Sequence, residues 1–354
     1  MKVIINGRFF SQRITGVQRF ALEIVRELDK IVSDKNYELY IPKHCNVSLK
    51  LKNIKVKESN SIFNGILWDI FSYSSYVKRE KGLSVNLCNG INLNKPSIVC
   101  IHDVTYKANP DFFSRTLKYK LKMLWNRFSY WFNTKHADFI ITVSKFSKKE
   151  IMKYYHINQD RIFVINNAWQ HVNRINDDKI NLSSSYPFLS SGTYFFSMST
   201  LEVNKNFRWV LNAAKNNPEY VFVIAGGGRL NEAANAIGFS NFVNVHFLGY
   251  ITDEEAKSLI KNCKAFIFPS LYEGFGLPPI EAMGVGCKNI ILSDIEVMHE
   301  IFGDSVSYID PKKFDYKFQK QDFENHTNSY HEILDKYSWA KSAAELYALI
   351  NRLK

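Results

Sequence analysis

Short apolar runs alternate along the chain with longer segments in which apolar residues recur every three or four positions. The short runs are rich in Val, Ile and Phe, which is typical of buried parallel strands. Strands are predicted at residues 2–6, 38–41, 97–101, 138–143, 161–165, 193–198, 220–225, 243–247, 265–268, 288–292 and 306–309. Helices are predicted at residues 17–30, 113–132, 145–155, 206–215, 253–262 and 279–284, and after Ser338. This alternation predicts a doubly wound α/β architecture.

Two series of predicted strands are separated by a polar stretch with two short serine runs. A chain of 354 residues is long enough for two cores. We therefore predict an N-terminal domain at residues 1–178, a linker at 179–192, a C-terminal domain at 193–337 and a terminal helix within 338–354. Ligands bind beyond the carboxyl ends of the strands in such sheets, so the site is expected in a cleft between the domains.

The net charge of +12 lies entirely in the first half of the chain. Residues 1–180 contain 30 Lys and Arg against 15 Asp and Glu, whereas the remaining residues contain 16 against 19. This asymmetry either serves solubility or indicates an anionic partner, such as nucleic acid, an acidic membrane or a phosphorylated acceptor.

The five cysteines are odd in number and include no Cys-x-x-Cys pair, which argues against a disulfide framework or a zinc site. The first residues contain too short an apolar run for a signal peptide, and no run of about 18 apolar residues occurs. We expect a cytoplasmic protein or one that is peripheral on the inner face of a membrane.

The segment from Phe268 to Met283 contains the strongest functional signal. It reads Phe-Pro-Ser-Leu-Tyr-Glu-Gly-Phe-Gly-Leu-Pro-Pro-Ile-Glu-Ala-Met, so that Glu273 and Glu281 flank seven residues. Its glycines allow the backbone to approach a ligand, and free amides at a helix start attract a diphosphate. Glu281, expected in the first helical turn, either accepts hydrogen bonds from vicinal hydroxyls such as those of ribose or is an acid favoured there by the helix dipole.

This segment resembles the signature of the retaining glycosyltransferases of family 4, and the resemblance extends over nearly the whole chain. It implies the GT-B fold, with two facing Rossmann-like domains, and a terminal helix that crosses back to the first domain. It also implies that Glu281 binds the nucleotide ribose and that Glu273 contacts the transferred sugar. The donor contacts implied within the segment are Glu273, Gly274, Phe275, Gly276, Leu277 and Glu281.

Further segments match motifs of the same family. Gly16 lies in Ile-Thr-Gly-Val-Gln-Arg-Phe, where a side chain would block a loop that closes over the donor; a plain turn glycine is the alternative. His102 lies in Ile-His-Asp-Val and is implied to contact the donor sugar at the catalytic centre. The neighbouring Asp103 either orients the His102 ring or caps the next turn. Gly226 ends a predicted strand and is implied to help shape the base and ribose pocket.

Lys205 follows a predicted strand in Glu-Val-Asn-Lys-Asn and is implied to neutralise the donor diphosphate. The preceding Asn204 is also predicted to lie in the donor-binding site, but the family usually has Arg at this position. One phosphate-binding cation is therefore missing unless Arg208 or Arg229 supplies it. No Asp-x-Asp motif occurs, so no metal is expected. No cofactor is expected either; the co-substrate is a GDP-, dTDP- or UDP-linked sugar. The residues proposed as catalytic are His102, Lys205 and Glu273.

Residues 113–132 predict a helix with an apolar stripe and a separate basic face. The basic face comprises Arg115, Lys118 and Lys122, together with Trp125. Such a face can rest on an anionic membrane, as a lipid-linked acceptor would require. The alternative is a helix that packs into the core through its stripe, with a solvated basic side. Stacking of single-stranded nucleic acid on these aromatic residues is disfavoured, because the stripe accounts for most of them.

Together these features predict transfer of a hexosyl unit, with retention, from a nucleoside-diphosphate sugar to a hydroxyl of a glycan or polyprenyl-diphosphate-linked acceptor. Within the family, the chain most resembles the mannosyl- and rhamnosyltransferases of bacterial O-antigen and capsule assembly. The alternatives are a nucleotide-sugar epimerase or hydrolase of the same fold, and a non-catalytic nucleic-acid-binding protein that uses the basic half.

Overall fold

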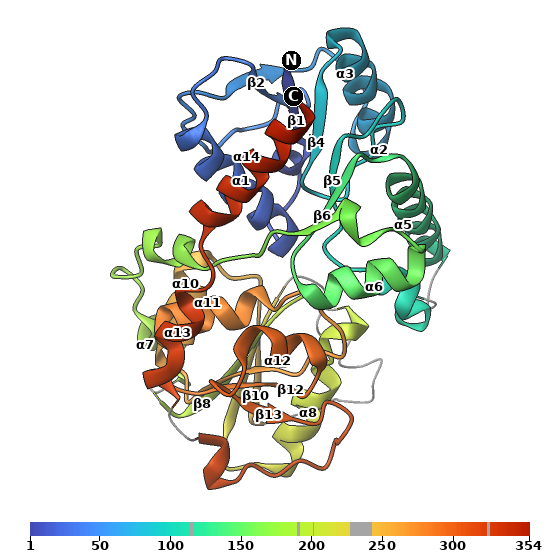
Figure 1. Ribbon diagram of the computed structural model, residues 1–354. Coiled ribbons are helices and arrows are strands. Elements are labelled where there is room, and N and C mark those ends of the chain that lie inside the picture. Colours follow the sequence, from blue (N-terminus) through green and yellow to red (C-terminus); the bar gives the residue numbers. More distant parts are fainter. Residues whose placement is uncertain (114–116, 190–191, 201, 227–242, 324–325) are drawn as a thin grey trace. The chain divides into compact units, whose positions relative to one another are not determined.

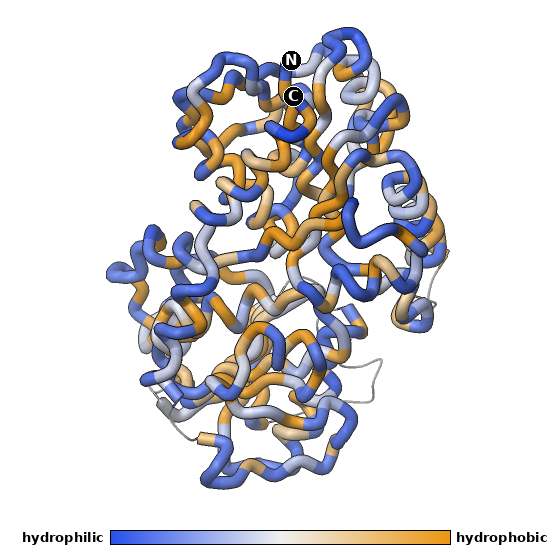
Figure 2. Tube along the Cα trace, viewed as in Figure 1, coloured by the Kyte–Doolittle hydropathy of each residue, from blue (hydrophilic) through white to orange (hydrophobic). Residues whose placement is uncertain are grey.

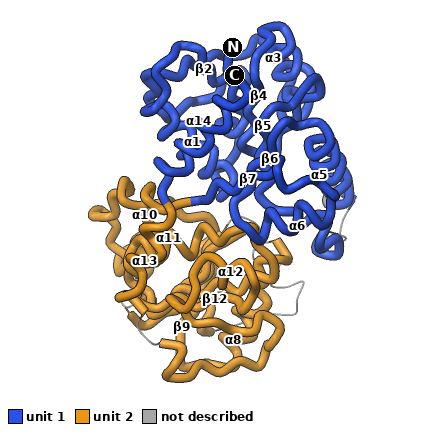
Figure 3. The backbone as a smooth tube through the Cα atoms, viewed as in Figure 1, with its two compact units in different colours: residues 1–167, 338–354 blue, residues 168–337 orange. Residues whose placement is uncertain are grey.

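The computed structural model describes residues 1–113, 117–189, 192–200, 202–226, 243–323 and 326–354, without the side chains of residues 118 and 119. The chain divides into two compact units (Figure 3). Unit 1 comprises residues 1–167 and 338–354, and unit 2 comprises residues 168–337. Each unit is built on a sheet of parallel strands connected by helices (Figure 1).

The sheet of unit 1 has seven strands among the described residues, in the order β3-β2-β1-β4-β5-β6-β7. All neighbouring strands pair in parallel. They are β1 (Val3–Asn6), β2 (Tyr37–Ile41), β3 (Lys55–Glu58), β4 (Leu83–Asn86), β5 (Ile98–Cys100), β6 (Phe139–Thr142) and β7 (Ile162–Val164). The strand order reverses between β1 and β4, which is the point where open α/β sheets bind ligands.

The helical segments of unit 1 lie between these strands and at the end of the chain. They are η1 (Arg8–Ser11), α1 (Gly16–Ile31), α2 (Gly65–Leu67), the π-helical η2 (Trp68–Tyr73), α3 (Ser74–Glu80), α4 (Thr105–Ala108), η3 (Pro110–Phe113), α5 (Leu117–His136), α6 (Lys145–Tyr155), η4 (Gln159–Arg161) and α14 (Trp339–Leu353). The terminal helix α14 contacts α1, with the rings of Trp339 and Phe20 6.1 Å apart. The terminal helix is therefore part of unit 1.

The described part of unit 2 contains a six-stranded parallel sheet in the order β10-β9-β8-β11-β12-β13. Its strands are β8 (Tyr194–Met198), β9 (Val221–Ala225), β10 (Val245–Gly249), β11 (Ala265–Phe268), β12 (Ile290–Ser293) and β13 (Ser307–Ile309). Its helical segments are η5 (Gln170–Arg174), α7 (Leu182–Ser185), η6 (Val203–Lys205), α8 (Phe207–Asn216), α10 (Asp253–Asn262), α11 (Leu277–Val285), α12 (Glu296–Phe302), η7 (Lys320–Phe323), η8 (Thr327–Ser329) and α13 (Tyr330–Leu334).

The core of each unit is formed by its strands and the apolar faces of its helices. Figure 2 shows strands in the interior of the units as largely hydrophobic. In unit 2, the fully buried Trp209 and Phe222 pack with Phe195, whose ring stacks on Phe318 at 4.5 Å. This aromatic packing holds β8 and α8 on either side of the segment that contains Lys205.

The predicted linker at residues 179–192 does not coincide with the division between the units, which falls after Asn167. Its described residues belong to unit 2 because they pack on α10. Leu189 is buried, and the hydroxyl of Tyr186 donates a hydrogen bond to Glu255 at 2.9 Å. The polar composition of the stretch reflects the exposed turn around α7 and not a connection between units.

Candidate active site

Lys205 and Glu273 meet at the point of unit 2 where the strand order reverses, between β8 and β11. Lys205 ends η6, which follows β8, and Glu273 lies on the loop between β11 and α11. The Lys205 ammonium lies 2.6 Å from Glu273 Oε1, and both side chains are largely buried. Because the pair is shielded from water, its Coulomb attraction exceeds that of a surface pair. Two of the predicted site residues are therefore in direct contact.

Asn204, which replaces the arginine expected from the family, is buried and braces the loop that follows β11. Its backbone carbonyl accepts a hydrogen bond from Leu271 N at 2.7 Å, and its side-chain amide donates to the Tyr272 carbonyl at 3.3 Å. Of the two candidate replacement cations, Arg208 is exposed with its guanidinium 4.9 Å from the Phe314 ring, and Arg229 lies outside the described residues. Asn204 thus has a structural role that an arginine side chain would not fill in the same way.

Gly276 allows the loop to turn directly into α11. Its φ is +101°, and a Cβ at this position would lie 3.2 Å from Met298 Sδ. With Gly276 as N-cap, α11 begins at Leu277, and the two prolines that follow Leu277 are tolerated in the first turn. Glu281 is consequently the fifth helical residue, so the expectation that it lies in the first turn is wrong.

The rest of the signature loop is anchored by apolar contacts. Phe275 is buried, and its ring meets the Tyr337 ring edge-on at 5.2 Å. Leu277 is buried at the start of α11. Gly274 lies between Glu273 and Phe275 on the same loop. The buried side chains of Phe275 and Leu277 therefore anchor the loop backbone that is predicted to lie beside the donor.

Glu281 contacts a residue that the sequence did not single out. Its Oε1 lies 2.8 Å from Nε2 of His171, which belongs to η5. His171 is almost fully buried, whereas the Glu281 side chain keeps 15% of its exposure. The two residues are 110 positions apart, and no motif surrounds His171, so nothing in the sequence connected them.

Gly226 is required by the close approach of two segments that leave neighbouring strands. It follows β9, and a Cβ there would lie only 1.8 Å from the carbonyl oxygen of Ser199, which follows β8. Its N–H donates to the Gly249 carbonyl at 2.7 Å. Gly226 therefore allows the segment after β9 to pack against Ser199, in the segment that leads from β8 to Lys205.

His102 lies two residues beyond β5 in unit 1 and is buried. Its Nε2 lies 2.9 Å from the Leu87 carbonyl, and its ring meets Phe20 edge-on at 5.0 Å. Burial lowers the pKa of His102, so the ring is neutral at neutral pH. Since the carbonyl requires a proton on Nε2, the other ring nitrogen of the neutral form is an acceptor. Any sugar hydroxyl that reached this nitrogen would therefore donate the hydrogen bond and His102 would accept it.

Gly16 is the first residue of α1, the helix that also contains Phe20. The preceding Thr15 is the N-cap, and its N–H donates to Gln18 Oε1 at 3.1 Å. Asp103, next to His102, accepts hydrogen bonds from the N–H and the hydroxyl of Thr105 at 2.8 and 2.5 Å. Asp103 therefore caps the turn that follows, which was one of its two predicted roles.

The helix predicted at residues 113–132 is observed as α5, but its apolar stripe is not in the core. The exposed residues of the stripe are Leu117, Leu121, Leu124, Phe128 and Trp131. The helix instead buries Ser129, Tyr130 and Asn133. Within the predicted basic face, Lys122 is exposed and Trp125 is half-buried. Arg115 and the side chain of Lys118 are not among the residues and side chains that the structure describes. No helix in the described ranges is long and apolar enough to span a membrane.

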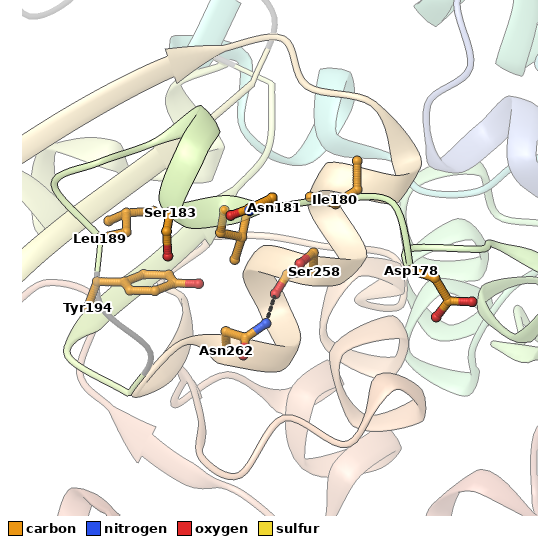
Figure 4. A pocket seen from close by; sticks show the side chains of 9 residues that line it. Asp178, Ile180, Asn181, Ser183, Leu189, Tyr194, Ser258 and Asn262 are labelled. Carbon is orange, nitrogen blue, oxygen red and sulfur yellow. Dashed lines mark hydrogen bonds between the residues drawn. The ribbon is translucent and has the colours of Figure 1, made fainter.

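A separate hollow of about 390 Å³ lies in unit 2 and includes none of the predicted site residues. Figure 4 shows its lining, with Asn262 donating a hydrogen bond to the Ser258 carbonyl at 2.8 Å. Tyr194 at its wall is the first residue of β8. The hollow is therefore at the opposite end of that strand from the segment that leads to Lys205.

Comparison with known proteins identifies both parts of the chain. Residues 82–169 match Glycosyltransferase Family 4, and residues 178–320 match Glycosyl transferases group 1. The chain is 25% identical over 325 residues to O-antigen chain mannosyltransferase RfbU of Salmonella typhimurium, which covers 87% of each chain. It is also 25% identical over 350 residues to O-antigen chain mannosyltransferase B of Escherichia coli, which covers 89% of this chain and 88% of that relative.

Solved structures share the fold at low sequence identity. The sucrose-phosphate synthase of Thermosynechococcus elongatus has a TM-score of 0.74 and 11% identity, covering 100% of this chain and 99% of that one. HepE of Anabaena, in complex with UDP and glucose, has a TM-score of 0.67 and 14% identity over 99% of each chain. The predicted GT-B class, with two Rossmann-like parallel-sheet domains, is confirmed. The chain therefore belongs to the glycosyltransferases that combine a Glycosyltransferase Family 4 domain with a Glycosyl transferases group 1 domain.

Proposed function

We propose that this glycosyltransferase moves a mannosyl unit, with retention, from a nucleoside-diphosphate sugar to a hydroxyl of a glycan or polyprenyl-diphosphate-linked acceptor in surface-polysaccharide assembly. Mannose is favoured over rhamnose because the relatives that cover most of the chain are O-antigen chain mannosyltransferases. The observation that supports the donor site best is the contact between Lys205 and Glu273 where the strand order reverses in unit 2.

In this proposal Lys205 stabilises the diphosphate as negative charge develops on the leaving group. Glu273, released from Lys205, accepts a hydrogen bond from the transferred sugar, and Glu281 binds the ribose hydroxyls. The leaving phosphate oxygen takes the acceptor proton on the same face of the sugar, so the protein contributes position and charge stabilisation. A neutral His102 would accept a hydrogen bond from the sugar through Nδ1.

We propose no metal in this reaction, since the sequence lacks an Asp-x-Asp motif and Lys205 offers a cation for the diphosphate. Turnover in excess EDTA should therefore equal turnover in Mg²⁺. Loss of activity in EDTA, with recovery on addition of Mg²⁺, would contradict this part of the proposal.

The decisive experiment incubates the protein with GDP-mannose, dTDP-rhamnose or UDP-glucose, with and without a polyprenyl-diphosphate-linked glycan. We expect GDP release only with GDP-mannose and mainly with acceptor, and an α-linked product by NMR if the donor is α-linked. Equal nucleotide release without acceptor would indicate an epimerase or hydrolase. Binding of nucleic acid without any turnover would instead indicate a non-catalytic nucleic-acid-binding protein.

We also propose that α5 rests on an anionic membrane through its apolar stripe, defined as Leu117, Leu121, Leu124, Phe128 and Trp131. The exposed fractions of these side chains range from 44% for Phe128 to 73% for Leu117. The sequence of α5 contains five Lys or Arg and no Asp or Glu, so its charge complements anionic lipid. Exposed Lys120 and Lys135 lie on the same side of the helix as the stripe by helical spacing.

A further inference from the structure

The contact between His171 and Glu281 joins η5 to α11 at a carboxylate that the proposed function assigns to the ribose. Glu281 Oε1 and His171 Nε2 are 2.8 Å apart, within hydrogen-bond distance. The His171 side chain is 3% exposed, and that of Glu281 is 15% exposed. The pair therefore has a buried donor on one side and a carboxylate that is still reachable on the other.

The position of His171 relative to α11 is fixed by the two residues that precede it, Trp169 and Gln170. The Trp169 ring packs on Gly284 of α11 so closely that a Cβ on Gly284 would lie 2.5 Å from Trp169 Cε3. Trp169 Nε1 donates to the Leu334 carbonyl at 3.0 Å, and Gln170 Nε2 donates to the Tyr337 carbonyl at 2.8 Å. These contacts hold the segment that contains His171 against α11, the helix that contains Glu281, and against the chain around α13.

We propose that His171 is a positioning residue for nucleotide recognition, which acts by holding the Glu281 carboxylate in one orientation. Each carboxylate oxygen has two lone pairs, so Oε1 can accept from His171 while Oε2 and the remaining lone pair of Oε1 accept from ribose hydroxyls. A carboxylate held in one rotamer loses less conformational freedom when the ribose binds. The proposal rests on the assignment of Glu281 to the ribose under the proposed function.

The test measures the Kd for GDP by calorimetry for the wild type, His171→Ala and His171→Gln. Loss of one hydrogen bond to a charged group should raise the Kd of His171→Ala roughly tenfold. His171→Gln retains an N–H near the position of Nε2 and should bind within about threefold of the wild type. The donor KM should follow the Kd, with kcat nearly unchanged, because the ribose interaction is present in both ground and transition states.

A matched control is provided by a second histidine–carboxylate pair in unit 2. His299 Nε2 lies 2.7 Å from Asp294 Oδ1, and both side chains are largely exposed. His299→Ala should leave the Kd for GDP unchanged. If His171→Ala reduces stability but binds GDP as tightly as the wild type, His171 has only a structural role and the proposal is wrong.

A double-mutant cycle shows whether His171 acts through Glu281. In a Glu281→Gln background, His171→Ala should cause little further loss of GDP affinity. An undiminished further loss would overturn the proposal. A wild type that binds none of GDP, UDP or dTDP would reject the proposed donor site itself, and with it this inference, whereas wild-type binding that is unaffected by His171→Ala rejects the inference alone.

Discussion

The ammonium of Lys205 lies 2.6 Å from Oε1 of Glu273, so the residue proposed to hold the diphosphate and the residue proposed to hold the sugar neutralise each other. Under the proposed function, the donor diphosphate competes with Glu273 for Lys205, and this competition frees the carboxylate for a sugar hydroxyl. The proposal therefore links recognition of the diphosphate to recognition of the sugar through the single contact between Lys205 and Glu273.

Removal of the Lys205 ammonium should mainly affect the chemical step. We expect Lys205→Ala to lower kcat by about 10² to 10³, the range typical for loss of a group that stabilises transition-state charge. Steady-state kinetics with saturating donor measures this. Lys257, whose Nζ lies 3.2 Å from Asp177 Oδ1 with similar exposure, provides a matched control. A similar loss of kcat in Lys257→Ala would contradict a specific role for Lys205.

Substitution of Gly226 should disrupt unit 2 locally. In Gly226→Ala the added Cβ would collide with the Ser199 carbonyl at 1.8 Å, so backbone must move and the free energy of unfolding should fall by about 3 kcal/mol or more. Thermal unfolding should show a fall in Tm of roughly 10 °C. In the control Gly65→Ala, also at positive φ, the added Cβ would meet open space. Equal decreases in the two variants would indicate that the contact with Ser199 is unimportant.

Stability should depend on pH through His102. Burial lowers its pKa below the ordinary value near 6.5, so the unfolded chain binds more protons than the folded chain as the pH falls below 6.5. The neutral His102 ring therefore causes no loss in the free energy of unfolding above about pH 6.5, and the free energy of unfolding falls as the pH drops below this value. We expect Tm to fall more between about pH 7 and about pH 5 in the wild type than in His102→Gln, which can still donate to Leu87. Parallel pH curves would argue against a buried, neutral His102.

The apolar stripe of α5 should determine membrane binding. In vesicle flotation the wild type should bind liposomes that contain phosphatidylglycerol, and Leu121→Glu with Phe128→Glu should reduce the bound fraction several-fold. The control Val243→Glu changes a 96% exposed apolar residue of unit 2 and should bind like the wild type. Higher salt should weaken binding, because anionic lipid and lysine attract each other. A double variant that floats unchanged but converts a dimer to a monomer would identify the stripe as a subunit interface.

The sequence predicted the parts of the site that lie next to strands. Lys205 and Glu273 could be placed together because each follows a strand with a strong apolar run, and β11 was predicted with its observed bounds. Strand β4 reads Leu-Ser-Val-Asn and buries two polar residues, so it had no apolar run to recognise. Strand β3 reads Lys-Val-Lys-Glu at an exposed sheet edge and resembled a loop.

Long-range and surface features were less accessible to prediction. The helical period of α5 identified the helix correctly, but periodicity alone cannot tell whether an apolar face meets the core or solvent. His171 could not be found because its only relation to Glu281 is spatial. In unit 1, Gly16 and His102 follow β1 and β5 as predicted; Gly16 is the first residue of α1, one residue earlier than the predicted helix start.

The contacts of Trp169 and Gln170 with Leu334 and Tyr337 also determine how this enzyme can be recombined with its relatives. A chimaera that exchanges unit 2 should be cut before Ala168 and after Tyr337, since both ends of this segment are integral to the unit. A cut within residues 179–192, where the polar composition predicts a linker, would separate α11 from Trp169 and His171, which contact it. Unit 2 can therefore be exchanged as a folded unit only if the segment that begins at Ala168 and the segment that ends at Tyr337 are exchanged with it.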